Sequence, residues 1–140
     1  MITLRKARTI VRKTLEKSRE LGLKPMSVIV VDAGGHVQAF EREDMASPGR
    51  FAIAQGKAYG SVMLGMAGTA QMARAEVQAY FIAAAGGALG GQMIPVPGGV
   101  LVRDKKGVVI GAVGVTGDTS DNDAIAAMAG VDAAGLIGEI

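Results

Sequence analysis

The sequence predicts an α+β fold in which an antiparallel sheet of about five strands is flanked by helices. Two observations predict this class. Short apolar, β-branched runs occur in pairs separated by glycine-containing turns, which is typical of β-hairpins, and segments with helical periodicity surround the pairs. The expected order is therefore α-ββ-αα-ββ-α, and residues 1–140 provide enough chain for a single domain with its own core.

The first helix and the first hairpin are predicted before residue 43. Apolar side chains recur every three or four residues over 3–21, which indicates an amphipathic helix. Residues 26–31 and 37–42 read as strands, and the two adjacent glycines between them accept the positive φ angles of a tight turn. The two strands therefore form a hairpin.

Two helices are expected between the hairpins. Ser47 followed by Pro48 is typical of a helix start. The helix that follows carries apolar side chains all around its axis over 51–66, so we expect it to be buried on more than one side, with a partner subunit as the second cover. Residues 71–85 predict a further helix, and the glycine- and proline-rich segment 86–97 predicts a long loop.

The second hairpin and the last helix complete the pattern. Residues 100–103 and 108–115 predict two strands joined by a short turn that ends in glycine. Residues 124–137 predict a helix, and Ser120 with Asp123 resembles a capping box at its start.

Composition excludes several classes of chemistry. The chain has no cysteine, which rules out thiol catalysis, thiolate metal sites and disulfides and is compatible with the reducing cytoplasm, where we expect the protein. A single histidine cannot form a multi-histidine metal site, and no glycine-flanked serine accompanies it as a triad nucleophile. The charged amino terminus has no apolar segment of the kind that secretory signals carry.

Charge and hydropathy argue against nucleic acid and membrane as partners. Residues 1–24 carry eight basic and two acidic side chains, but these alternate with apolar positions as on a solvated helix face, and aromatic side chains on which bases could stack make up only 4% of the chain. Residues 77–102 carry no charge, yet their two prolines and six glycines would leave backbone groups unsatisfied in a bilayer.

Five short motifs occur in order along the chain. They are Val-Asp-Ala-Gly-Gly-His-Val at 31–37, Phe-Glu-Arg at 40–42, Ala-Gln-Gly-Lys-Ala at 54–58, Gly-Ala-Val-Gly-Val-Thr-Gly at 111–117, and Asp123 followed by Ala-Gly at 129–130. This set resembles the GlcG/HbpS-like family, which includes haem-binding proteins and the carboxy-terminal domain of PduO-type cobalamin adenosyltransferases. The resemblance covers nearly the whole chain, with Leu101 where the family usually has proline.

The resemblance implies a profilin-like sheet flanked by helices, compact homo-oligomers from tetramer to octamer, and binding of haem or a related tetrapyrrole. His36 is then a candidate ligand for haem iron, because imidazole is a common axial ligand. The alternative is a histidine at a hairpin exit that binds nothing. No other metal ligand is expected.

Lys57 interrupts an otherwise apolar helix, so its ammonium group needs a partner. That partner is water, a carboxylate, for instance that of Asp32 or Asp123, or an anionic ligand such as a propionate. Thr116 and Gly117 lie before the last helix, where backbone N–H groups accommodate anions, although helix capping explains the same residues.

The predicted ligand site lies between the first hairpin, the helix of Lys57 and the loop 116–123. Its residues are His36, Arg42, Lys57, Thr116, Gly117 and Asp123. The leading hypothesis is an oligomeric protein that binds a small ligand, with haem as the named candidate. Two alternatives stay open. One is an enzyme without a cofactor that acts on a small carboxylate or carbonyl metabolite of a catabolic pathway, with Lys57 as base or electrostatic clamp, and the other is a structural accessory module without a ligand. No catalytic residue is identified.

Overall fold

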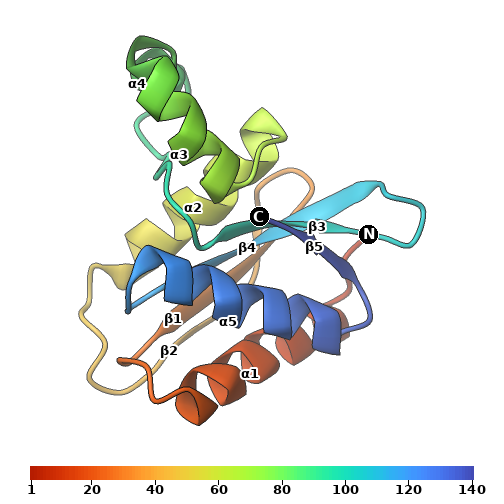
Figure 1. The fold of residues 1–140 in the computed structure, drawn as a ribbon. Helices are drawn as coiled ribbons and strands as arrows, with labels where there is room; N and C mark the ends of the chain where they lie inside the picture. The colour runs from red at the N-terminus through yellow and green to blue at the C-terminus, as the bar shows by residue number, and fades with distance from the viewer.

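The computed structural model describes residues 1–140 and is built around one five-stranded antiparallel sheet (Figure 1). The strands are β1 (Ser27–Asp32), β2 (Val37–Arg42), β3 (Gly99–Arg103), β4 (Val109–Thr116) and β5 (Ile137–Glu139). Their order in the sheet is β2-β1-β4-β3-β5, and each neighbouring pair is antiparallel. The two predicted hairpins therefore share one sheet, joined through β1 and β4, which confirms the predicted fold class.

Five helices surround the sheet. They are α1 (Leu4–Glu20), α2 (Arg50–Leu64), α3 (Gly68–Val77), α4 (Ala79–Ala88) and α5 (Ser120–Ala133). Helices α1 and α5 pack side by side on one face, whereas α2 covers the other face (Figure 1). Helices α3 and α4 project away from the body, and α4 packs chiefly against α3 (Figure 1).

The sheet separates two apolar cores of unequal size. Val28 and Val30 of β1 point towards α1 and α5 and belong to a cluster of 16 buried residues, whereas Ile29 and Val31 point towards α2 and belong to a cluster of 5. The smaller cluster has little side-chain volume, so the α2 backbone lies close to the strands.

A pair of glycines permits this close approach. Gly99 and Gly114 pair directly across β3 and β4 beneath α2. A Cβ atom at Gly99 would lie 2.5 Å from the carbonyl oxygen of Lys57, and one at Gly114 would overlap the carbonyl oxygen of Ala54. The backbone of α2 therefore occupies the space that side chains would need at these two strand positions.

The structure corrects the predicted helix over 71–85. Two helices occupy this region, α3 and α4, and Gln78 separates them with the non-helical angles φ −141° and ψ 62°. The side chain of Gln78 accepts a hydrogen bond from Arg74 Nε and donates one to the hydroxyl of Tyr80. Because no glycine or proline stands at this break, the sequence carries no stop signal there. Helix α4 also continues through the two glycines at 86 and 87, where a stop was predicted.

The carboxy-terminal helix begins and ends four residues earlier than predicted, at 120–133 instead of 124–137. Helix α5 ends at Ala133, Gly135 turns the chain with φ 72°, and β5 then pairs with β3. At its start, Thr119 rather than Ser120 is the N-cap, because its hydroxyl accepts the N–H of Asn122 at 3.2 Å. Helix α2 begins at Arg50 rather than at Ser47, without a side-chain cap.

The second cover of α2 comes from the same chain. A Cβ atom at Gly56 would lie 2.5 Å from Ile94 Cγ1, and one at Gly60 would lie 2.7 Å from Met93 Cγ. The loop before β3 thus packs on the flank of α2 where we expected a partner subunit. None of the five helices combines the length and apolarity needed to cross a bilayer.

We expect Gly114→Ala to lower the free energy of unfolding by about 2–3 kcal/mol, because the added methyl group forces α2 away from the sheet. Urea denaturation followed by circular dichroism measures this. Gly87→Ala is the matched control, since Gly87 is a helical glycine at which a Cβ atom would meet nothing within 4 Å. Equal stability of the two variants would contradict close packing at Gly114.

Candidate functional site

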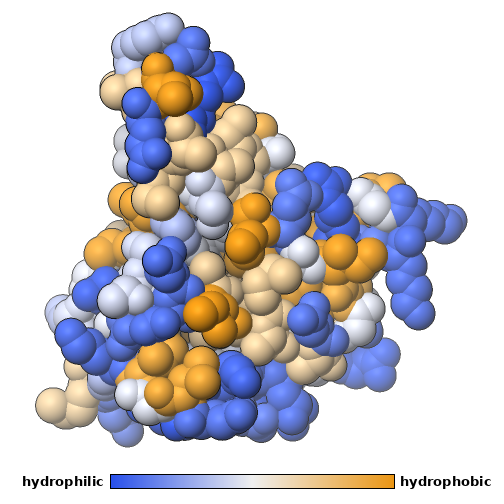
Figure 2. Space-filling view, viewed as in Figure 1, coloured by the Kyte–Doolittle hydropathy of each residue, from blue (hydrophilic) through white to orange (hydrophobic).

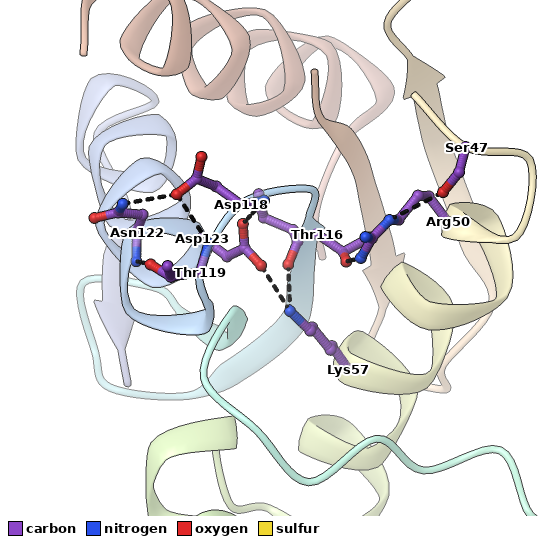
Figure 3. A network of polar contacts seen from close by, with 9 residues as sticks. Ser47, Arg50, Lys57, Thr116, Asp118, Thr119, Asn122 and Asp123 are labelled. Atoms are coloured by element: carbon purple, nitrogen blue, oxygen red, sulfur yellow. Dashed lines mark hydrogen bonds and ion pairs between the residues drawn. The ribbon is translucent and has the colours of Figure 1, made fainter. Parts of the chain in front are cut away.

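A buried ion pair links α2 to α5. The Nζ atom of Lys57 lies 2.9 Å from Asp123 Oδ2 and donates a second hydrogen bond, also of 2.9 Å, to the carbonyl oxygen of Val115 (Figure 3). The two side chains are 3% and 2% exposed, respectively. Of the partners expected for Lys57, the structure therefore selects the carboxylate of Asp123 and not that of Asp32.

Burial and pairing act in opposite directions on these two groups. Burial lowers the pKa of the Lys57 ammonium and raises the pKa of the Asp123 carboxyl, while the attraction between the two charges partly restores both. The second carboxylate oxygen of Asp123 accepts the N–H of Asp118 at 3.0 Å. The pair is therefore enclosed and hydrogen-bonded, with neither charge directed to solvent.

The loop that follows β4 is held by its own polar groups. The carboxylate of Asp118 accepts hydrogen bonds from the side chain of Asn122 (Figure 3) and from the backbone N–H groups of Lys24 and Thr119. These hydrogen bonds, of which that from Asn122 contributes most, lower the pKa of Asp118 to about 2. Gly117, with φ 154°, lies against the backbone of Pro25 and Met26, where a Cβ atom would not fit.

A row of polar side chains crosses the sheet beside the start of α2. Ser27 of β1 pairs with Arg42 on one side and with Thr116 on the other, so these three side chains share the α2 face. The guanidinium of Arg50 donates to the hydroxyls of Thr116 at 2.7 Å and Ser47 at 3.2 Å (Figure 3). Arg42 donates to the carbonyl oxygen of Ala46 at 2.6 Å. Ser27 Oγ is buried without a hydrogen-bond partner. We call Ser27, Arg42 and Thr116 the polar row.

Sequence reasoning missed Ser27 and Arg50. A serine within the strand run 26–31 is a polar residue at a position that the pattern predicts to be buried, and this was the available signal. No sequence pattern pointed to Arg50, because Thr116, the hydroxyl partner of its guanidinium, is 66 residues away in the sequence.

His36 lies at the opposite end of β1 from the polar row. Five residue steps separate Ser27 from Asp32 along the strand, which corresponds to roughly 17 Å. The imidazole is 81% exposed, and its Nδ1 lies 3.2 Å from Asp32 Oδ1. The same carboxylate accepts the backbone N–H groups of His36 and Gly34, and these bonds, that from His36 foremost, lower the pKa of Asp32.

The predicted site residues thus form two groups rather than one. Lys57, Thr116, Gly117 and Asp123 lie together near the carboxyl end of β4, with Arg42 at the same edge of the sheet, whereas His36 is remote from them. Five hollows of about 230 to 570 Å³ open on the surface, and neither Lys57, Thr116, Asp123 nor His36 lines any of these five. No group of three or more histidine, aspartate and glutamate side chains gathers in a way that could hold a metal ion.

The model of one protein family, described as "Haem degrading protein HbpS-like", matches residues 2–132 of this sequence. The chain belongs to the HbpS-like family. This confirms the family resemblance of the five sequence motifs and accounts for the hairpins and helices that they occupy. A search of curated proteins finds no match to this HbpS-like chain.

Solved structures share the HbpS-like fold over almost their whole length. PduOC, crystallised as a complex with haem, matches 94% of this chain over 94% of its own, with a TM-score of 0.84. The two sequences are only 22% identical, so this likeness shows the fold alone. Protein ORFY of Klebsiella pneumoniae is 26% identical, with coverage of 96% of this chain and 90% of that chain and a TM-score of 0.79. A double mutant of HbpS from Streptomyces reticuli is 27% identical, with coverage of 93% and 84% and a TM-score of 0.78.

Lys57→Met is expected to lower the free energy of unfolding by about 3–5 kcal/mol, because it leaves the Asp123 carboxylate buried without a counter-charge. Combining it with Asp123→Leu is expected to recover much of this loss, since no buried charge then remains. Chemical denaturation of both variants and of Lys106→Met, an exposed lysine, provides the measurement. A loss below about 1 kcal/mol for Lys57→Met would mean that the pair is open to solvent.

Proposed function

We propose that this HbpS-like chain is a homo-oligomeric protein that binds haem or a related tetrapyrrole, with His36 as the iron ligand. The observation that carries the proposal is the arrangement of the His36 imidazole. Its Nδ1 is held by the Asp32 carboxylate, while its Nε2 has no partner within the chain. Family membership and the haem complex of PduOC support the choice of ligand.

The donor groups around His36 fit an iron ligand. Carboxylate contacts to the second ring nitrogen are usual for ligating histidines, because they orient the ring and raise the basicity of the nitrogen that binds the metal. The carboxylate of Asp32 is itself held by the two backbone N–H groups of the turn, so the imidazole is oriented before any ligand arrives. When bound, haem supplies an iron centre that can coordinate small ligands or exchange electrons.

The turn that carries His36 rests on apolar parts of α2. A Cβ atom at Gly35 would lie 2.9 Å from the Tyr59 ring and 3.1 Å from Met63 Cε, and the neighbouring side chain of Val37 is 45% exposed. A flat apolar macrocycle ligated by His36 therefore finds apolar side chains beside the ligand. The buried Lys57–Asp123 pair, in contrast, gives no specific support to an enzyme in which Lys57 acts as a base.

Assembly into a tetramer to octamer is part of the proposal because the chain leaves apolar surface uncovered. On the projection formed by α3 and α4, Val77 is 77% exposed and Tyr80 is 73% exposed. A second apolar surface is formed by α5 and the residue after β5, where Ile125 and Ile140 line a hollow of about 500 Å³. Hydrophobic residues gather on this face (Figure 2). Contiguous exposed apolar surface of this kind is typical of interfaces.

Titration of the purified protein with haemin tests the ligand. We expect a shifted Soret band for the wild-type chain and its loss in His36→Ala, because this variant removes the only imidazole. Asp32→Asn should retain the band with about 10- to 100-fold weaker binding, since it weakens the support of Nδ1. Lys105→Ala, an exposed residue in the other hairpin turn, is the control. An absent shift in the wild type would refute the haem proposal, and an unchanged one in His36→Ala would refute the ligand.

Light scattering at micromolar concentration tests assembly. We expect an oligomer for the wild-type chain and a smaller species for Ala84→Glu, which places a charge on the exposed face of α4 while keeping a good helix former. Lys105→Glu changes the charge at an exposed turn outside the projection and should leave the mass unchanged. A monomeric wild type would overturn the proposed assembly.

A further inference from the structure

The guanidinium of Arg50 has no acidic partner. Arg50 is the first residue of α2, and its side chain is half-buried beside the polar row. Both of its side-chain hydrogen bonds go to neutral hydroxyls, those of Thr116 and Ser47 (Figure 3). No carboxylate lies within 4.0 Å of it, whereas Arg19 and Arg103 each pair with a glutamate. A half-buried guanidinium with only neutral partners leaves most of its charge uncompensated.

The surroundings of Arg50 add positive charge. The first turn of α2 contains no acidic residue, its N-cap Gly49 offers no side chain, and the helix dipole makes this end of the helix electropositive. Lys57 lies on the same helix, and besides burial the charge of Arg50 helps to lower the pKa of its ammonium. The one buried carboxylate nearby, that of Asp123, is already bound to Lys57. This end of α2 therefore has an excess of positive charge.

Ser27 supplies a second and independent observation. Its Oγ atom is fully buried and has no hydrogen-bond partner, although buried hydroxyls nearly always have one. Because Ser27 pairs directly with Thr116 across β1 and β4, the two side chains stand next to each other on the α2 face. An unused hydroxyl donor thus lies beside the Thr116 hydroxyl that Arg50 contacts.

We propose that Arg50, Ser27 and Thr116 form a subsite that binds one carboxylate group of a small ligand. A carboxylate only accepts hydrogen bonds, so it can use the guanidinium and both hydroxyls at once, and its charge offsets the excess at the start of α2. Arg50 is partly exposed and its neighbour Gly49 is exposed, whereas Ser27 and Thr116 are buried, so the guanidinium is the part of the subsite nearest to solvent. This subsite rests on the proposed ligand-binding function and names the chemistry of the ligand, which belongs either to a free carboxylate metabolite or to the propionate of a tetrapyrrole.

Thermal unfolding in sodium acetate and sodium propionate, against sodium chloride at equal ionic strength, tests the subsite. We expect the carboxylates to raise the Tm with saturation and chloride to raise it less. Arg50→Gln should abolish the difference, whereas Arg12→Gln, which removes an exposed arginine on α1, should preserve it. An equal effect of carboxylate and chloride on the wild type, or an unchanged carboxylate effect in Arg50→Gln, would overturn the subsite.

Ser27→Ala separates ligand binding from a structural role. Removal of an unpaired buried hydroxyl should leave the ligand-free protein as stable as the wild type or more stable, and yet weaken carboxylate binding by about tenfold. This variant also keeps the test decisive if Arg50→Gln fails to fold. A variant that binds carboxylate as tightly as the wild type would remove Ser27 from the subsite.

Haemin titration of the same variants distinguishes the two sources of carboxylate and separates this proposal from the haem proposal. Weaker haemin binding in Ser27→Ala, with wild-type binding in Arg12→Gln, would support the subsite and identify a propionate as its occupant. Acetate binding without haemin binding would support the subsite with a free metabolite and refute the haem proposal. Haemin binding without any acetate or propionate effect, and unchanged in Ser27→Ala, would refute the subsite and leave the haem proposal intact.

Discussion

The close contact between α2 and the sheet places Lys57 within reach of Asp123. Because Gly99 and Gly114 have no side chains, the α2 backbone lies directly on β3 and β4. At this separation the side chain of Lys57 reaches past the strands to Asp123 on α5, which packs on the other face of the sheet. Gly98 also leaves room for the Lys57 side chain, since a Cβ atom at this position would lie 2.8 Å from Lys57 Nζ. Three glycines and one ion pair thus connect the two faces of the sheet.

The sequence predicted the sheet well because hairpins are local structures. Each hairpin is specified by two β-branched runs and a glycine turn that lie within about twenty residues of one another, so its pairing needs no long-range information. The two hairpins were predicted to share one sheet, in line with the family resemblance, but the pairing of β1 with β4 that joins them was not specified. The break at Gln78 and the strand β5 were missed, because side-chain hydrogen bonds and a tertiary partner, respectively, decide them.

The candidate site was predictable only in part for the same reason. Lys57 is the charged residue within an otherwise apolar helix, so a partner for its ammonium group was expected. Of the two carboxylates considered, Asp32 and Asp123, the structure pairs it with Asp123. The separation of His36 from this pair depends on the direction of β1, and patterns of residue types do not measure distances along a folded strand. Ser27 could have been noticed as a polar residue within a buried strand run, but its missing hydrogen-bond partner, like the missing acid beside Arg50, is visible only in three dimensions.

The short strand β5 has a consequence for the behaviour of the chain in solution. Without it, the outer backbone groups of β3 would form an open edge bearing Val100, Leu101 and Val102, a run well suited to pairing with strands of other molecules. Three residues and the ion pair between Arg103 and Glu139 cover this edge. Local separation of β5 from β3 therefore controls how often the sheet exposes an aggregation-prone border, independently of how stable the two cores are.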